Sequence, residues 1–159
     1  LNALRLSRIA LHARTGKQQY KGHPDLEAFQ GFYELCQHPL YYNGGIESLS
    51  DIRQILIRFP LLKGVFIGRG LLSSPLLAKE FKGNETFLPE QRMSIYFAFH
   101  EELFSAYSQV LQGETQLLVK MKTLWEYFLP ETDRKLLKRI KKSTRLQQYT
   151  ESVKAIFTS

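Results

Sequence analysis

Two short glycine-containing segments have the composition of phosphate-binding loops. Asn43-Gly44-Gly45 follows one apolar segment of the chain, and Gly68-Arg69-Gly70 follows the next. Glycine lets the backbone approach a ligand closely, N–H groups at the start of a helix attract anions, and arginine adds a charged, forked donor. The same glycines also occur in tight turns that bind nothing, so each loop alone is a weak signal.

A histidine and two cations follow a further apolar segment. His12 ends the apolar residues 8–12, and Arg14 and Lys17 come shortly after it. A neutral imidazole at a strand end can hydrogen-bond a flat ring or a phosphate, although a lone histidine in this position is more often structural. Arg14 and Lys17 are solvent-facing cations by default.

Three strand-then-helix units are expected to position these residues. The apolar patterns predict strands at 8–12, 39–42 and 64–67. Helices are predicted at 26–36, from a Ser48 or Ser50 cap to the residue before Pro60, and at 76–81. Because no hairpin signal separates the strands, the pattern favours a parallel sheet, whose ligands bind at the carboxyl ends of the strands. The three polar loops are therefore expected at one edge of the sheet.

The second half of the chain has a helical pattern only. Helices are predicted at 91–111, 115–128, 131–142 and 144–157, joined by short loops. The fold class expected is therefore α/β followed by all-α. The domain boundary is predicted between residues 87 and 88, with an α/β part at 1–87 and a four-helix domain at 88–159.

The charge distribution favours an acidic partner. The formal net charge is +7, and nucleic acid is the first partner class that such a charge suggests. Seven cations and no acid occur between residues 134 and 145: Arg134, Lys135, Lys138, Arg139, Lys141, Lys142 and Arg145. This basic helical face fits contact with a phosphate backbone, and its simpler interpretation is a solvated surface.

Several chemistries are excluded. A single cysteine, Cys36, rules out an internal disulfide and a cysteine-based zinc site. His23, His38 and His100 lack metal-ligand spacing, so no metal is expected. No apolar run approaches the roughly 18 residues that a membrane span needs, and a reducing, cytoplasmic compartment is expected.

Three motifs together resemble one known family. They are HARTGKQQYKG at 12–22, YYNGGI at 41–46 and GVFIGRGLLSSP at 64–75. Their order and spacing are similar to those of the tRNA-dihydrouridine synthases. The resemblance is close over the first half, and the helical half is similar in architecture and position only.

This resemblance implies an FMN-dependent (β/α)8 TIM barrel followed by a helical tRNA-binding domain. Such enzymes reduce the C5–C6 double bond of particular tRNA uridines, and NADPH first reduces the flavin. By the resemblance, the cofactor-binding residues are His12, Asn43, Gly44, Gly45, Gly68 and Arg69. The nucleic-acid-binding residues are expected to be Arg14 and Lys17, with Lys138, Arg139, Lys141, Lys142 and Arg145 from the basic helical face. The family usually has an acid where Gly45 stands, so any side-chain role at that position is lost.

The resemblance also implies that the chain corresponds to the sixth to eighth βα units of the barrel. The first five strands, a flavin-contacting lysine and the proton-donor cysteine are then expected upstream, and Cys36 matches no such position. A missing barrel half would leave the isolated chain inactive and prone to dimerise or swap elements. The alternative is a non-catalytic RNA-binding or assembly fragment.

Overall fold

The computed structural model describes residues 1–18 and 22–158. The chain divides into two compact units, Leu1–Leu71 and Leu72–Ser159. This division falls earlier than the predicted domain boundary because helix α4 (Leu77–Gly83) groups with the helices that follow it. The buried carboxylate of Glu80 on α4 pairs with the guanidinium of Arg92. The domain assignment at residue 87 itself stays a prediction.

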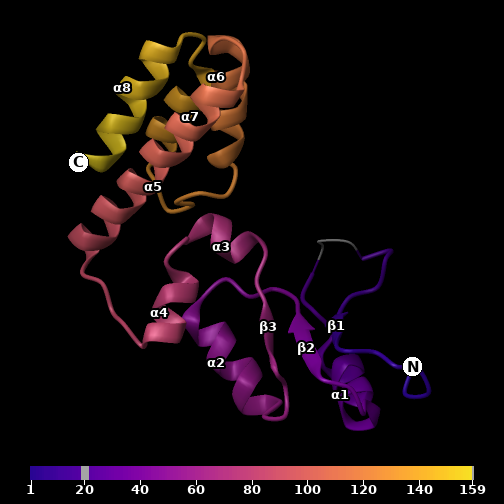
Figure 1. The fold of residues 1–159 in the computed structure, drawn as a ribbon. Helices are drawn as coiled ribbons and strands as arrows, with labels where there is room; N and C mark the ends of the chain where they lie inside the picture. Colours follow the sequence, from indigo (N-terminus) through magenta and orange to yellow (C-terminus); the bar gives the residue numbers. More distant parts are fainter. Residues whose placement is uncertain (19–21, 159) are drawn as a thin grey trace. The chain divides into compact units, whose positions relative to one another are not determined.

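The first unit alternates strand and helix, as the sequence predicts. Its elements are β1 (Ile9–His12), α1 (Leu26–Leu35), β2 (Leu40–Asn43), α2 (Leu49–Arg58) and β3 (Gly64–Phe66). The strands form a parallel sheet in the order β1-β2-β3, with β2 in the middle (Figure 1). The register aligns His12 with Asn43, and Asn43 with Phe66. The carboxyl ends of the three strands therefore lie in one row.

Side-chain caps start the two longer helices of this unit. The Asp25 carboxylate accepts a hydrogen bond from the Ala28 N–H at 2.9 Å, which begins α1. Ser48 begins α2 through a reciprocal capping box with Asp51: Ser48 Oγ accepts from the Asp51 N–H at 3.1 Å, and Asp51 Oδ2 accepts from the Ser48 N–H at 2.8 Å. Of the two candidate caps for α2, Ser48 is therefore the one used.

The helices cover one face of the sheet. Leu40 and Tyr42 are buried on that face, and the Phe29 ring of α1 packs edge-on against Tyr42 at 4.9 Å and against Phe59 at 5.0 Å. The opposite face carries the alternate residues of each strand. On that face His12 is exposed and Phe66 is 46% exposed. The row of strand-end side chains therefore lies on the less covered face.

The segment after β3 differs from the prediction of one helix at 76–81. A short helix, α3 (Arg69–Ser73), begins directly after Gly68, and α4 follows from Leu77. The early start is possible because Gly70 has no side chain. A Cβ on Gly70 would collide with the backbone oxygen of Ile46 and lie 3.0 Å from Cα of Glu47. The loop after β3 thus packs directly on the loop after β2.

The second unit contains the four predicted helices in addition to α4. They are α5 (Pro89–Val110), α6 (Glu114–Leu124), α7 (Arg134–Lys142) and α8 (Leu146–Phe157). Helices α6 and α7 are shorter than predicted, because residues 125–127 form a turn and the Asp133 side chain caps α7 at Lys135 and Leu136. The core of the unit includes Met121, Trp125 and Phe128, each at most 2% exposed.

A buried polar network joins three parts of this helical core. The indole N–H of Trp125, which can only donate, is 3.0 Å from the Tyr149 hydroxyl oxygen. The Tyr149 hydroxyl then donates to Nε2 of His100 at 2.7 Å, and Nδ1–H of His100 donates to Glu101 at 3.1 Å. Burial lowers the pKa of His100 against the raising effect of Glu101, so the imidazole is held neutral.

Replacing Gly70 by alanine should destabilise the first unit. The added methyl group must displace the Ile46 carbonyl or α3, at a cost of roughly 1–3 kcal/mol in the free energy of unfolding. Gly68→Ala is the matched control, because a Cβ there meets nothing within 4 Å. Thermal and urea unfolding followed by circular dichroism measure both variants. Equal stability of the two would contradict the proposed contact.

The free energy of unfolding of the helical unit should fall as the pH drops below about 6.5. The lowered pKa of His100 means that the unfolded chain binds its proton first, so stability present above that pH is lost on acidification. The loss from one such group is at most about 1.4 kcal/mol per pH unit. Urea titrations between neutral and mildly acidic pH measure it. His100→Gln should remove this share of the pH dependence, and an unchanged slope in that variant would contradict the assignment.

Candidate functional site

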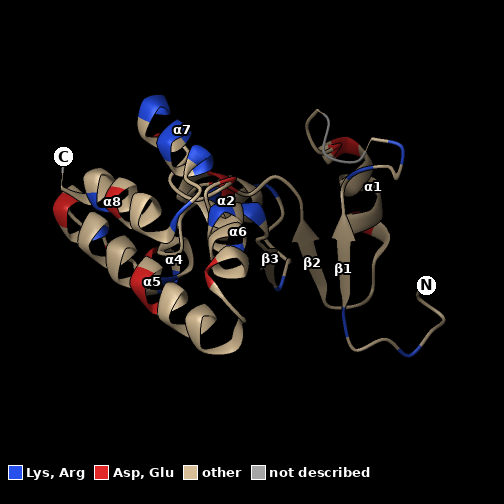
Figure 2. Ribbon diagram, turned by 90° about the horizontal axis from the view of Figure 1, so that it is seen from above, with Lys and Arg blue, Asp and Glu red and all other residues tan. Residues whose placement is uncertain are grey.

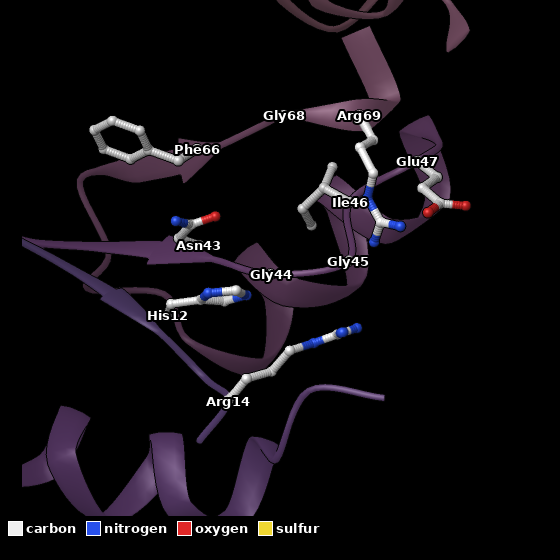
Figure 3. A pocket seen from close by; sticks show the side chains of 10 residues that line it. All are labelled: His12, Arg14, Asn43, Gly44, Gly45, Ile46, Glu47, Phe66, Gly68 and Arg69. Carbon is white, nitrogen blue, oxygen red and sulfur yellow. The ribbon is translucent and has the colours of Figure 1, made fainter. Parts of the chain in front are cut away.

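A cavity of about 260 Å³ lies at the carboxyl ends of the three strands. Figure 3 shows its lining side chains, which come from the ends of all three strands and from the segments that follow them. The lining residues are His12, Arg14, Asn43, Gly44, Gly45, Ile46, Glu47, Phe66, Gly68 and Arg69. All six residues predicted to bind a cofactor are therefore brought together in one place. Arg14, predicted to contact nucleic acid, lines the same cavity.

The sheet register positions three side chains of the cavity. His12, Asn43 and Phe66 are the last residues of β1, β2 and β3, and they are paired across the sheet. Their side chains follow one another along the strand ends (Figure 3). The row combines an imidazole, an amide and an exposed aromatic ring. Such a set can hydrogen-bond the edge of a flat polar ligand and pack against its face.

The glycines of the two loops serve different purposes. Gly44 and Gly45 have φ angles of 155° and 59°, and a Cβ on either would lie 3.2 Å from Pro24. The conformation of the turn and its close contact with Pro24 therefore suffice to explain why both positions are glycine, although both residues also line the cavity. Gly68 is different, because its φ is not in the left-handed region and the space beyond it is open. That open space lets a ligand approach the backbone at Gly68.

The start of α2 contributes less to anion binding than the sequence suggests. The N–H groups of Glu47 and Ser48 both donate to Oδ2 of Asp51, at 3.0 and 2.8 Å. These donors are already satisfied by a carboxylate. The binding of an anion in the cavity therefore depends on Gly44 and Gly45 and on the lining arginines, Arg14 and Arg69.

The cavity contains both signs of charge. Arg14 and Arg69 supply two cations, and Glu47 supplies an acid that the sequence analysis did not single out. Burial raises the pKa of the Tyr42 hydroxyl beneath the loop, Arg14 opposes that shift, and Asp51 reinforces it.

The sequence analysis did not identify three of the lining residues, Ile46, Glu47 and Phe66. Their only sequence signal is their position at or after a strand end.

The remaining cation predicted in the first unit, Lys17, is not among the residues that line the cavity. Lys17 is exposed in the turn after β1. Residues 19–21 of the motif HARTGKQQYKG lie outside the described residues.

Part of the basic cluster of the second unit lines a groove, and part of it lies outside that groove. Figure 2 shows the concentration of cations on α7. Lys138, Arg139 and Lys142 line a groove of about 440 Å³, together with Lys135 of the same helix. Lys141 and Arg145 are exposed but do not line this groove. The structure thus brings together three of the five cations predicted there.

Neither metal binding nor a reactive thiol is indicated within the described part of the chain. No group of three or more His, Cys, Asp and Glu side chains there could hold a metal ion. Cys36 is partly buried at the end of α1, with its Sγ 3.6 Å from the His38 carbonyl oxygen. No helix among the described residues is long and apolar enough to cross a membrane.

Comparison with known proteins identifies the family of this chain. The family model of dihydrouridine synthase (Dus) matches residues 6–158. The chain belongs to this family, which confirms the resemblance of the three motifs.

Two curated relatives are similar to part of the chain. A probable tRNA-dihydrouridine synthase of Aquifex aeolicus (strain VF5) is 34% identical over 77 residues, which are 48% of this chain and 24% of the relative. Another, of Rhizobium leguminosarum bv. phaseoli, is 36% identical over 67 residues, or 42% of this chain and 21% of the relative. The matched part therefore spans about a quarter or less of these relatives' length.

Proposed function

We propose that this chain is the C-terminal part of an FMN-dependent tRNA-dihydrouridine synthase, with the strand-end cavity as its FMN site. The observation that carries the proposal is the convergence of all six predicted cofactor residues on one cavity in a member of the dihydrouridine synthase family. When bound, FMN supplies the hydride that reduces the C5–C6 double bond of a uridine in tRNA, after its own reduction by NADPH.

The residues at the glycine end of the cavity fit a phosphate group. Among the described residues, the N–H groups of Gly44 and Gly45 enter no hydrogen bond. The open space at Gly68 admits a phosphate to the backbone, and Arg69 offers a guanidinium beside it. These groups recognise a phosphate by its charge and shape, and they would anchor the cofactor by its terminal group.

The strand-end row fits the flat ring of a flavin. His12 and Asn43 present hydrogen-bonding side chains, and Phe66 presents an exposed ring on the same face of the sheet. Arg14 lines the cavity from the loop after β1. In the proposal His12 and Asn43 hold the ring, and Arg14 contacts the RNA that approaches it.

The uncovered face of the sheet favours a place for it in a larger barrel. Parallel sheets are normally covered on both faces, whereas His12 and Phe66 are exposed on the face away from α1 and α2. In the proposal the chain supplies the sixth to eighth βα units of a (β/α)8 barrel, and the earlier strands cover that face. A cysteine of those strands would donate the proton to the uracil ring.

The alternative function is a non-catalytic RNA-binding or assembly fragment. It is favoured by the exposed apolar residues of the first unit, among them Leu35 at 75% and Ile57 at 80% exposure. Such a fragment would self-associate and would not bind flavin. A flavin titration distinguishes the proposed synthase from such a fragment. An assay of dihydrouridine formation in tRNA, with the full-length protein, FMN and NADPH, then tests the activity. Flavin binding without uridine reduction would limit the proposal to the cofactor site.

Arg69→Ala and Asn43→Ala should weaken FMN binding by the full-length protein. Loss of a hydrogen bond to a charged group costs roughly 1.5–3 kcal/mol, so Arg69→Ala should raise the Kd about 10- to 100-fold, and Asn43→Ala by less. Quenching of flavin fluorescence measures the Kd. Arg53→Ala is the matched control, because Arg53 is an exposed cation of α2 outside the cavity. Unchanged affinity in both site variants would refute the assignment.

Glu47→Gln should act in the opposite direction. The carboxylate lines the cavity and repels a phosphate dianion, so its neutralisation should lower the Kd for FMN by roughly 2- to 5-fold. Riboflavin, which lacks the phosphate, should show no such gain. An equal gain for both flavins would place the phosphate away from Glu47.

A further inference from the structure

A cavity within the helical unit has the size and lining of a small-molecule site. Its volume is about 460 Å³, within the range of roughly 300–1,000 Å³ that is usual for such sites. Its walls come from the end of α3, from α5, from residues 129–133, from α7 and from α8. None of its lining residues belongs to the strand-end cavity or to the basic groove of α7.

Apolar side chains form one part of this helical-unit cavity. Ile156 of α8 is buried and belongs to the core of the unit. Met93, Leu129 and Leu136 pack against that core and also line the cavity. An apolar group of a ligand that covers these side chains gains about 25 cal/mol for each Å² removed from water.

A cluster of polar side chains supplies hydrogen-bond donors to the same cavity. The buried Tyr96 hydroxyl oxygen accepts a hydrogen bond from Nη1 of Arg92 at 3.3 Å. With that bond in place, the Tyr96 hydroxyl donates to Ser74 Oγ at 2.7 Å. The hydroxyl hydrogen of Ser74 then has no acceptor among the residues that the structure describes.

The charge of Arg92 in this cluster is already compensated. Its guanidinium pairs with the buried carboxylate of Glu80. Arg92 uses three of its five N–H groups on Glu80 and Tyr96. Donors therefore remain in this part of the cavity, but no net positive charge does. The cluster suits the oxygen of a neutral carbonyl group better than it suits a carboxylate.

Two acids before α7 give the cavity a negative charge. Asp133 accepts both of its capping bonds, from the N–H groups of Lys135 and Leu136, at Oδ1. Within the described part of the chain, neither its Oδ2 nor the carboxylate of Glu131 has a hydrogen bond or an ion pair. Both acids are exposed, so they line the cavity where solvent reaches it. A positively charged group of a ligand is favoured there.

We propose that the helical-unit cavity binds a small organic cation in which a primary ammonium stands beside a carbonyl group and an apolar side chain. An apolar amino-acid amide and the first residue of a peptide both have this chemistry. The carbonyl oxygen accepts hydrogen bonds from Ser74 and Arg92, and the side chain packs on the apolar part of the cavity. The ammonium pairs with Glu131 and Asp133. The site goes beyond the proposed function and requires neither flavin nor RNA.

The test uses probes that each lack one of these groups, with the full-length protein. Leucinamide carries all of them, isoamylamine lacks the carboxamide, isocaproamide lacks the ammonium, and glycinamide lacks the apolar side chain. Saturation-transfer NMR of the ligand signals measures each Kd. Leucinamide should bind with a Kd on the order of 1 mM, and each of the others at least about 5-fold more weakly. Leucine should also bind more weakly than its amide, because the two acids repel its carboxylate.

Two variants test the polar contacts. Ser74→Ala should raise the Kd for leucinamide roughly 5-fold and leave that for isoamylamine unchanged, because isoamylamine has no carbonyl group. Ser94→Ala is the matched control, since Ser94 is an exposed serine of α5 outside this cavity. Glu131→Gln should raise the Kd for leucinamide by roughly 2- to 5-fold and leave that for isocaproamide unchanged. Its control is Glu126→Gln, an exposed position that does not line the cavity.

Equal affinities for leucinamide, isoamylamine and isocaproamide would overturn the proposal in favour of unspecific apolar binding. The absence of saturation transfer at millimolar probe concentrations would overturn it too, as would equal effects of each variant and its control. Glu131→Gln changes an exposed side chain, so it tests the site even if Ser74→Ala unfolds the helical unit.

Leucylglycylglycine distinguishes the two sources of the ligand. Tighter binding than that of leucinamide identifies the start of a peptide, and equal or weaker binding identifies a free amide. Either result supports the site. Because all measurements are made without FMN and RNA, failure of this proposal leaves the proposed function untouched, and the reverse also holds.

Discussion

The close packing of two loops is the constraint on which the candidate cofactor site depends. Gly70 lies so near the Ile46 carbonyl that no larger residue fits without a shift of the backbone. This contact holds the loop after β3 against the loop after β2, and it allows α3 to begin at Arg69. Without it Arg69 and Gly45 would belong to two independent turns. The shape of the cavity depends on this close approach, because the backbone oxygen of Ile46 occupies the space that a side chain at position 70 would fill.

Charge is handled differently in the two units. In the first unit, the Asp51 carboxylate accepts hydrogen bonds from the N–H groups of Glu47 and Ser48 at the start of α2. The groups left for an anion there are the backbone of the glycines and the side chains of the arginines. In the second unit, the cations of α7 remain without ion pairs among the described residues and line an extended groove. The first arrangement leaves few donors for an anion, and the second leaves several cations side by side on one helix.

Much of the fold could be predicted from the sequence because its signals are local. Short apolar runs before polar loops marked the strands, and Pro60 and the serine cap marked the limits of α2. The early start of α3 could not be predicted, since it depends on contact between Gly70 and a loop more than twenty residues earlier. The convergence of the predicted cofactor residues followed from parallel topology, which places all strand ends at one edge. The contribution of α8 to the groove requires the tertiary packing and leaves no trace in local spacing, and the only sequence signal for Glu47 is its position after a strand end.

The network of His100, Tyr149 and Trp125 has a consequence for the alignment of the helices. Its three side chains come from α5, from the end of α6 and from α8, and each hydrogen bond is directional. A slide of α8 by one turn, about 5.4 Å, would break both bonds and bury the polar atoms unpaired. The network therefore sets the axial register of α8. Glu151 and Ser152 follow Tyr149 within one turn of that helix, so a buried tyrosine determines which residues face the cations of α7.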